Sequence, residues 1–309
     1  MEALIDSNLP GLQLVSKGKV RDIYSTSWPG YLLFVASDRI SAYDVILRNG
    51  IPGKGKLLTK ISMFWFDKLG HIIPNHFVTA NVDEMPPEVH KYKEQLDGRA
   101  MLVRKAKVVP LEAIVRGYIT GSAWSEYKRF GTVHGIAMPS GLVESQKFPT
   151  PIFTPSTKAA QGQHDENISP ERAAEIVGQE IYDRISKLAV ELYTAAADYA
   201  AGRGVILADT KFEFGLISGE DGKESLILVD ELLTPDSSRY WPASSYQPGQ
   251  PQPSFDKQYL RDWLRASGFR TGLESGPVGK EGQGWVIDED VVRGTAARYE
   301  EVVKLLIGA

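Results

Sequence analysis

Cysteine is absent from all 309 residues of the chain. The protein therefore has no disulfide, no thiolate nucleophile and no cysteine ligand for a metal ion. This composition fits a reducing compartment, and we expect the protein in the cytoplasm. The sequence also lacks a G-x-S-x-G elbow, so it does not indicate catalysis by a serine nucleophile of that type.

Long apolar runs and an excess of basic residues are absent as well. No run approaches the roughly 20 residues that a membrane helix needs, and residues 1–11 do not resemble a signal peptide. The formal net charge is −4 at pH 7, whereas a nucleic-acid-binding protein is usually basic. We therefore expect no membrane, no nucleic acid and no obligate protein partner. Small anionic substrates are not excluded, because a site needs only local positive charge.

Hydrophobic residues make up 42% and charged residues 24% of the chain, which is an ordinary globular balance. The pattern alternates short strands with helices and predicts an α+β fold with mixed or antiparallel sheets and flanking helices. Pro110 interrupts two apolar strands and marks a hinge between two lobes. We place an N-terminal lobe at 1–109 and a C-terminal lobe at 110–309. The helices are expected at 58–69, 122–130, 170–202 (divided at Gly178), from 254, and at 288–307.

The stretch from Val205 to Asp230 predicts an antiparallel hairpin. Side chains alternate across a strand, so Asp209, Lys211 and Glu213 share one face, and Asp230 follows the second strand. Carboxylates beside a lysine suit a magnesium ion that holds phosphate oxygens. The alternative is the solvent-exposed face of an edge hairpin, and the hairpin alone leaves both interpretations open.

Two motifs near the N-terminus combine charge with turn residues. In KGKVRDIY, Lys17 and Lys19 flank Gly18, which lets backbone N–H groups approach a phosphate. The alternative is a basic hairpin at the surface. In SDRISAYD, Asp38 and Arg39 follow a buried strand, where polar residues often form sites, although a capped turn explains them equally well.

Arginines mark two further candidate motifs. VRGYITGSAW places Arg116 before Ser122, at the start of a helix whose N–H groups could receive an anion. TPDSSRYWP places Asp236 and Arg239 directly after the hairpin. The alternative for the first motif is a helix cap with a structural arginine.

Two other segments are less specific. Residues 148–169 are expected to form a long polar loop, and a loop of that length is often functional. GIPGKGKL nearly matches a P-loop, but Leu57 stands where the magnesium-binding serine or threonine belongs. We expect a basic surface turn there.

Taken in order, GKVRDIY, SDRISAYD, VRGYITGS, FTPSTK with HDENIS, DTKFEFG and DELLTPDSSRYW resemble the SAICAR synthetase family, the phosphoribosylaminoimidazole-succinocarboxamide synthases. The resemblance spans about Lys17–Leu264 and is greatest to the longer, fungal-type members. It implies a two-lobed ATP-grasp-like fold with ATP between the lobes. It also implies a ligase of purine biosynthesis that joins CAIR, a carboxylated aminoimidazole ribonucleotide, to L-aspartate with magnesium and ATP.

The resemblance implies roles for individual residues by motif match. Lys211, Glu213 and Asp230 would be catalytic, and Glu213 and Asp230 would hold Mg²⁺ and thereby bind ATP. The ATP phosphates would lie at Lys17, Gly18, Lys19 and Val20. The substrate would contact Asp38, Arg116, Ser122, Asp209, Lys211, Asp236 and Arg239.

The chemistry of such a ligase agrees with these residue types. A carboxylate becomes an electrophile when it is phosphorylated, and the site then needs metal and lysine at the phosphates and arginines at the carboxylates. One rival is a small-molecule kinase on a related ATP-binding scaffold, which would release ADP without aspartate. The other is a non-catalytic nucleotide-binding module, which would not need Glu213 and Asp230 as paired metal ligands.

Overall fold

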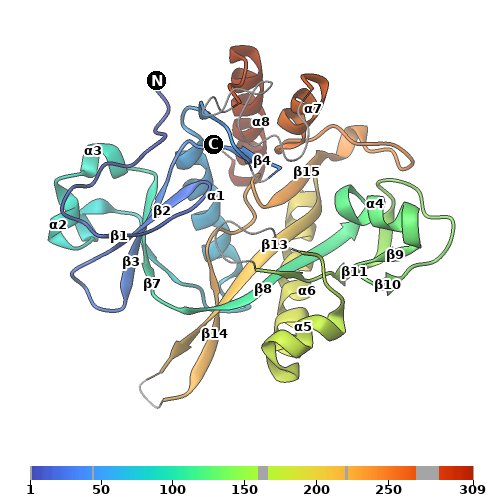
Figure 1. The fold of residues 1–309 in the computed structure, drawn as a ribbon, viewed down its shortest axis with the longest axis horizontal. Coiled ribbons are helices and arrows are strands. Elements are labelled where there is room, and N and C mark those ends of the chain that lie inside the picture. Colours follow the sequence, from blue (N-terminus) through green and yellow to red (C-terminus); the bar gives the residue numbers. More distant parts are fainter. Residues whose placement is uncertain (1, 44, 159–165, 220–221, 269–284, 309) are drawn as a thin grey trace. The chain divides into compact units, whose positions relative to one another are not determined.

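The computed structural model describes residues 2–43, 45–158, 166–219, 222–268 and 285–308 (Figure 1). Its residues cluster into two compact units. Unit 1 contains Met1–Phe64, His76–Lys105 and Phe255–Gly308, and unit 2 contains Trp65–Asn75 and Ala106–Ser254.

This division differs from the expected boundary at 109/110, because the last two helices belong to unit 1. Helices α7 (Gln258–Ala266) and α8 (Glu289–Ile307) bring Leu260 and Val291 into one hydrophobic cluster with Ile40 and Leu47. Burial of this apolar surface fixes the C-terminal helices on N-terminal residues. Sequence periodicity showed the helices but not the surface on which they pack.

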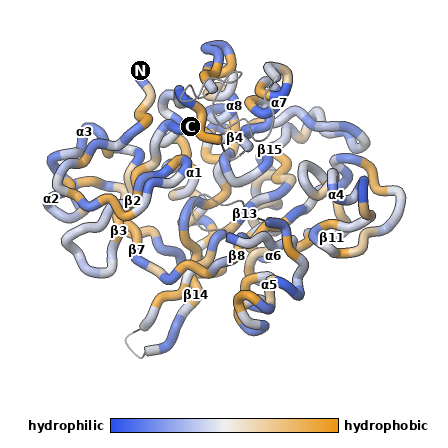
Figure 2. Tube along the Cα trace, viewed as in Figure 1, coloured by the Kyte–Doolittle hydropathy of each residue, from blue (hydrophilic) through white to orange (hydrophobic). Residues whose placement is uncertain are grey.

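Unit 1 is built on an antiparallel sheet of five strands in the order β1-β2-β3-β7-β6. The strands are β1 (Leu14–Lys17), β2 (Arg21–Ser25), β3 (Tyr31–Ala36), β7 (Ala100–Arg104) and β6 (Phe77–Thr79). The central strands β3 and β7 are strongly hydrophobic in Figure 2, and Leu33 and Leu102 are fully buried. Unit 1 also contains the short elements β4 (Ser41–Ala42), β5 (Val45–Ile46), η1 (Val82–Glu84), α2 (Pro87–His90) and α3 (Lys93–Leu96).

The second half of the P-loop-like segment, from Lys54 to Leu57, forms the first turn of α1 (Lys54–Leu69), so the helix starts before the expected residue 58. The expectation of a basic surface turn is wrong for Lys54, which is fully buried and whose Nζ donates to the carbonyl oxygen of Arg39 at 2.9 Å. This lysine therefore satisfies a buried backbone acceptor in the fold.

Unit 2 is built on an antiparallel sheet in the order β11-β8-β13-β14, with β12 also paired to β8 and β15 also paired to β13. The strands are β8 (Lys107–Tyr118), β11 (Lys147–Phe153), β12 (Ser156–Thr157), β13 (Val205–Ser218), β14 (Glu224–Val229) and β15 (Ser238–Pro242). The remaining elements are α4 (Gly121–Phe130), β9 (Thr132–Val133), β10 (Ile136–Ala137), α5 (Pro170–Val177), α6 (Gln179–Ala201) and η2 (Ala243–Ser245).

The expected break at Pro110 is wrong, because β8 continues through it. The pairing of β8 with β13 is irregular here: Glu112 lies opposite Glu213, whereas Val108 lies opposite Gly215. Proline has no N–H to donate to a strand ladder, and an irregularity of this kind accommodates it. The chain leaves one strand and enters the next at Lys105 and Ala106 instead.

Strand β13 has the alternation that its sequence predicts. Phe212 and Phe214 are fully buried, while Lys211 retains an exposed fraction of 28% in its side chain. The antiparallel β13–β14 hairpin is also confirmed. Gly178, at a φ of +86°, separates α5 from α6 as expected.

The polar segment 148–169 is less irregular than predicted. Residues up to Phe153 belong to β11, which pairs with β8, and residues 159–165 lie outside the described residues. In the described part of the chain, no helix combines the length and the apolar character needed to cross a membrane.

Candidate functional site

Three strands of unit 2 place two arginines on one carboxylate. Asp209 of β13 lies opposite Arg116 of β8 and opposite Arg239 of β15. Arg116 Nη1 donates to Asp209 Oδ2 at 3.2 Å, and Arg239 Nη1 donates to the same oxygen. One negative charge thus holds two positive charges. The group of Arg116, Asp209 and Arg239, called the arginine row below, therefore carries a net positive charge that suits an anion.

The N–H groups of the Arg116 guanidinium are almost all bonded within the protein. Its side chain is 4% exposed, and its Nε donates to Thr154 Oγ1 at 3.0 Å, while Nη2 lies 3.3 Å from Ser122 Oγ. Burial lowers the pKa of Arg116 to about 10, although Asp209 opposes this change. The guanidinium therefore stays protonated at neutral pH.

Arg239 is the more accessible arginine, with a side chain that is 22% exposed. It lies against the first residue of α4, because a Cβ added to Gly121 would fall 2.5 Å from Arg239 Nη2. Gly121 also has a φ of +59°, so a glycine here both leaves room for Arg239 and adopts the left-handed backbone conformation. The N-terminus of α4, with Ser122 in its first turn, thus lies beside both arginines, and its N–H groups favour an anion there.

His134 is a site residue that the sequence did not reveal. It is 2% exposed, and its Nδ1 lies 2.8 Å from the carbonyl oxygen of Pro155. That acceptor requires a proton on Nδ1, so the neutral ring presents Nε2 as an acceptor to Arg116 Nη2 at 3.3 Å. Glu126 of α4 accepts the backbone N–H of His134 at 3.0 Å and so anchors its turn.

The environment keeps His134 neutral. Burial lowers the pKa of His134 to about 4, and the positive charge of Arg116 contributes to the same change. A charged imidazole would repel Arg116 and would lose its acceptor nitrogen. His134 therefore orients Arg116 without competing with it for an anion.

A second charge cluster surrounds Lys211 on the same face of β13. Lys211 Nζ donates to Glu213 Oε1 at 3.0 Å and to Glu112 Oε1, and Lys158 Nζ donates to Glu213 Oε2. Glu112 and Glu213 lie directly opposite each other on β8 and β13. Two like charges at this position are tolerated because two ammonium groups lie against them.

The pKa values in this cluster follow from its charges. Burial alone would lower the pKa of Lys211, but Glu213, Glu112 and Asp230 raise it well above its ordinary value. Burial alone would raise the pKa of Glu213, but Lys211 and Lys158 lower it to about 2. At neutral pH the lysine is therefore a cation and Glu213 is a carboxylate.

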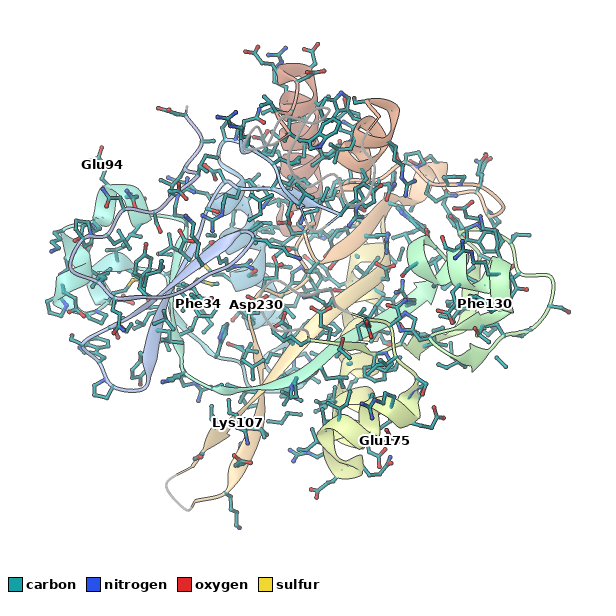
Figure 3. All side chains as sticks on the ribbon, viewed as in Figure 1. Phe34, Glu94, Lys107, Phe130, Glu175 and Asp230 are labelled. Atoms are coloured by element: carbon teal, nitrogen blue, oxygen red, sulfur yellow. The ribbon has the colours of Figure 1, made fainter. Side chains whose placement is uncertain are left out.

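Asp230 lies at the end of β14, where the chain turns away from β13 (Figure 3). Its φ is +64°, a region that aspartate and asparagine enter more readily than most residues. Its charge acts on Lys211, as predicted for the hairpin. Asp236 is half-buried in the following turn, where its N–H donates to Thr234 Oγ1 at 3.2 Å.

In unit 1 the expected phosphate residues form the turn between β1 and β2. Lys17 and Lys19 are exposed, and Gly18 N donates to the carbonyl oxygen of Arg21 at 2.7 Å across the turn. Lys17 Nζ donates to Asp6 Oδ1 at 2.6 Å, in a pair whose side chains are 50% and 66% exposed. An exposed pair of this kind contributes little to stability.

Asp38 has a clear place in the fold of unit 1. It is fully buried, its Oδ1 accepts Gly55 N at 2.8 Å, and its Oδ2 accepts Leu4 N at 2.8 Å. Arg99 forms an ion pair with it at 3.0 Å. These bonds tie Asp38 to the start of α1, and its role toward a substrate stays a prediction.

Sequence reasoning missed Glu112, Lys158 and His134. Glu112 did have a signal, because it shares the alternate positions of a predicted strand with Arg116, but the sequence did not show that this strand pairs with β13 and places Glu112 opposite Glu213. Lys158 ends the FTPSTK motif of the family resemblance but was not singled out, and His134 had no signal of either kind. Among the described residues, no group of three or more histidine, aspartate or glutamate side chains is arranged to hold a metal ion.

Comparison with known proteins gives consistent matches. The model of the SAICAR synthetase family matches residues 14–275. A phosphoribosylaminoimidazole-succinocarboxamide synthase from Pichia angusta is 55% identical, covering 98% of this chain and 97% of its own. The solved SAICAR synthase from Saccharomyces cerevisiae, complexed with SAICAR, is 52% identical at a TM-score of 0.86 and covers 99% and 98% of the two chains. A type-2 SAICAR synthetase in complex with ADP shares the fold at 24% identity, with a TM-score of 0.65 and coverages of 95% and 97%.

The depressed pKa of His134 predicts a pH-dependent stability. In the unfolded chain the imidazole takes up its proton near the ordinary pKa of 6.5, whereas the folded protein resists protonation down to about pH 4. The stabilising contribution is therefore complete above pH 6.5 and is lost as the pH falls towards 4. One pKa unit is worth about 1.4 kcal/mol, so the loss should reach roughly 3 kcal/mol.

Denaturant unfolding of His134→Asn between pH 7 and pH 4 checks this expectation. Asparagine tolerates the φ of +49° at this position, so the backbone is preserved. The free energy of unfolding should depend less steeply on pH in the variant than in the wild type. His71→Asn, at an exposed histidine of the same unit, is the control and should keep the wild-type slope. An unchanged slope in His134→Asn would contradict the assigned environment.

Proposed function

Because the chain belongs to the SAICAR synthetase family, we propose that it joins the carboxylate of CAIR to the amine of L-aspartate with ATP, giving SAICAR, ADP and phosphate. It is an ATP-dependent carbon–nitrogen ligase of purine biosynthesis. The observation that carries the proposal is the charged face of β13. There Asp209, with two arginines, precedes Lys211 and Glu213 at alternate positions of one strand.

The arginine row is the proposed site of the anionic substrate. Arg116 uses its N–H groups on Thr154, Asp209, Ser122 and His134 and has little capacity left for a ligand. Arg239 has the greater exposure and is the direct contact, supported by Ser122 and the first N–H groups of α4. Asp209 holds the guanidinium groups of both arginines in place. Asp38 and Asp236 stay in the proposed substrate set by family resemblance alone.

Glu213 and Asp230 fit a magnesium ion only together with the substrate phosphates. Mg²⁺ is commonly bound by one or two carboxylates, with phosphates and water completing the shell. Lys158 and Lys211 now neutralise Glu213, so Lys158 would have to move for a cation to bind. When bound, the ion would neutralise phosphate charge, and Lys211 would add a second positive charge at the transferred group.

In unit 1 the turn at Lys17, Gly18, Lys19 and Val20 is the proposed contact for the ATP phosphates. Its lysines are exposed, and the glycine permits a close approach of the backbone. The partners are thus small molecules: ATP, CAIR and L-aspartate. We propose the cytoplasm as the compartment, because a chain without cysteine fits a reducing environment.

The proposed chemistry places an acyl phosphate between CAIR and the amide. The substrate carboxylate attacks the γ-phosphorus of ATP, ADP leaves, and the aspartate amine then displaces phosphate from the acyl carbon. The amine loses a proton in this step. One carboxylate oxygen therefore departs with the phosphate.

Turnover with CAIR labelled with ¹⁸O in its carboxylate tests the function and this route together. We expect SAICAR to form and one labelled oxygen to appear in the released phosphate. Sustained ADP release should need both CAIR and aspartate. ADP release without aspartate, accompanied by a stable phosphorylated product, would identify a kinase. SAICAR formed together with unlabelled phosphate would exclude the acyl phosphate.

The metal assignment predicts the behaviour of Asp230→Asn. Asparagine tolerates the φ of +64°, so the fold is kept while the negative charge is lost. We expect most of kcat to be lost and the magnesium concentration for half-maximal rate to rise about tenfold, because one carboxylate–metal bond is worth at least one charged hydrogen bond. Glu213→Gln should behave in the same way.

A magnesium titration of the initial rate measures this effect. Asp198→Asn, at an exposed carboxylate of α6, is the matched control and should leave the titration unchanged. Wild-type turnover of Asp230→Asn at ordinary magnesium would show that this carboxylate does not hold the ion.

The substrate assignment predicts that Arg239→Ala weakens the binding of CAIR and not that of ATP. A charged hydrogen bond contributes about 1.5–3 kcal/mol, so the Kd for CAIR should rise roughly ten- to hundredfold. Calorimetry with each ligand separates the two affinities. Arg203→Ala, at an exposed arginine of the same unit, is the control. Loss of ATP binding with unchanged CAIR binding would reverse the assignment.

A further inference from the structure

In the turn between β1 and β2, the carbonyl oxygens of Gly18 and Lys19 both accept hydrogen bonds from one buried arginine, Arg39. Arg39 Nη2 donates to the carbonyl oxygen of Gly18 at 3.0 Å, and Arg39 Nε donates to that of Lys19 at 3.3 Å. Ser37 takes the next carbonyl, since its Oγ and its N donate to Val20 O at 2.8 and 2.9 Å. Three consecutive carbonyls are thus bound from within unit 1.

These hydrogen bonds to the carbonyl groups also fix the direction of the next N–H group along each peptide bond. In a planar trans peptide the C=O of one residue and the N–H of the next point in opposite directions, and unit 1 has no cis peptide among its described residues. The N–H of Lys19 and the N–H of Val20 therefore point away from Arg39. Successive N–H groups with a common direction form a concave site that favours an anion.

Arg39 is built to hold this turn and not to touch a ligand. Its side chain is 3% exposed, and it forms an ion pair with Asp22, which is equally buried, at 2.6 Å. Its remaining Nη1 donor reaches Ile5 O at 2.6 Å. All five N–H groups of the guanidinium are thus used: on Gly18, Lys19, Ile5 and both oxygens of Asp22.

We propose that Arg39 is a positioning residue for nucleotide binding, which orients the backbone N–H groups of Lys19 and Val20 towards the phosphates by holding the carbonyl groups of Gly18 and Lys19. The proposal rests on the proposed function of the turn as the ATP-phosphate contact. It adds that the directed backbone, and not only the lysine charge, binds the phosphates. Arg39 acts through the turn, whereas Lys17 and Lys19 act directly.

Arg39→Lys tests the proposal in the full-length protein. Lysine keeps a positive charge beside Asp22 but cannot reach the two turn carbonyls and Ile5 together, because it lacks the planar fork. Calorimetry should show Mg·ADP binding at least tenfold weaker than in the wild type, with CAIR binding unchanged. In turnover, KM for ATP should rise while kcat stays within about threefold. The amide resonances of Lys19 and Val20 should no longer respond to Mg·ADP as they do in the wild type.

Arg99→Lys is the matched control for a merely structural effect. Arg99 is also buried in unit 1 and is paired with a buried carboxylate, Asp38, but it does not touch the turn. The Arg99→Lys variant should lose about as much thermal stability as Arg39→Lys and should keep the wild-type affinity for Mg·ADP. Equal losses of nucleotide affinity in both variants would overturn the proposal.

Should Arg39→Lys fail to fold, the double variant Arg39→Gln/Asp22→Asn removes both buried charges together and avoids leaving one unpaired. It should show the same loss of Mg·ADP affinity. A folded variant of either kind with wild-type affinity would overturn the role of Arg39. A wild-type protein that binds no Mg·ADP would instead overturn the proposed function of the turn, so the two failures are distinguishable.

Discussion

The charged face of β13 depends on complete pairing of buried charge. Asp209 and Glu213 have side chains that are 7% and 6% exposed, and each is neutralised by two cations. An unpaired charge at such a position typically destabilises a protein by about 3–5 kcal/mol. The neighbouring strands must therefore pair in the register that brings Arg116, Glu112 and Arg239 opposite β13. Fold and site are consequently specified by the same contacts.

The two units use buried arginines for different purposes. In unit 2, Arg116 binds side chains and helps to place a set of charges around Asp209. In unit 1, Arg39 binds backbone carbonyls and gives direction to a turn whose own side chains are exposed. Guanidinium suits both tasks because its planar fork offers five donors with fixed geometry. An exposed lysine cannot impose such order on its surroundings.

Local patterns predicted much of the fold and part of the candidate site. Alternation along β13 identified Asp209, Lys211 and Glu213 as one face, because side-chain direction in a strand follows from chain position alone. The pairing of β13 with β8 was not predictable, since Pro110 suggested a break and the irregularity that accommodates it involves residues about 100 positions away. His134 was hidden for the same reason: its contacts with Pro155 and Arg116 exist only in the folded chain. The packing of α7 and α8 on residues 40–51 depends equally on tertiary structure.

Strands β14 and β15 share one edge of β13 but pair with different parts of it, at residues 213–218 and 205–210. Between them, Lys211 N donates to Ser237 O at 3.1 Å, and the chain from Asp230 to Ser237 leaves the edge and returns to it. Each ladder has its own register, and the segment that connects them carries Asp230 and Asp236 and buries Leu233 and Thr234 completely. An inserted or deleted residue would leave both strand pairings in place but would displace Asp230 from Lys211, so we expect this segment to keep its length during evolution.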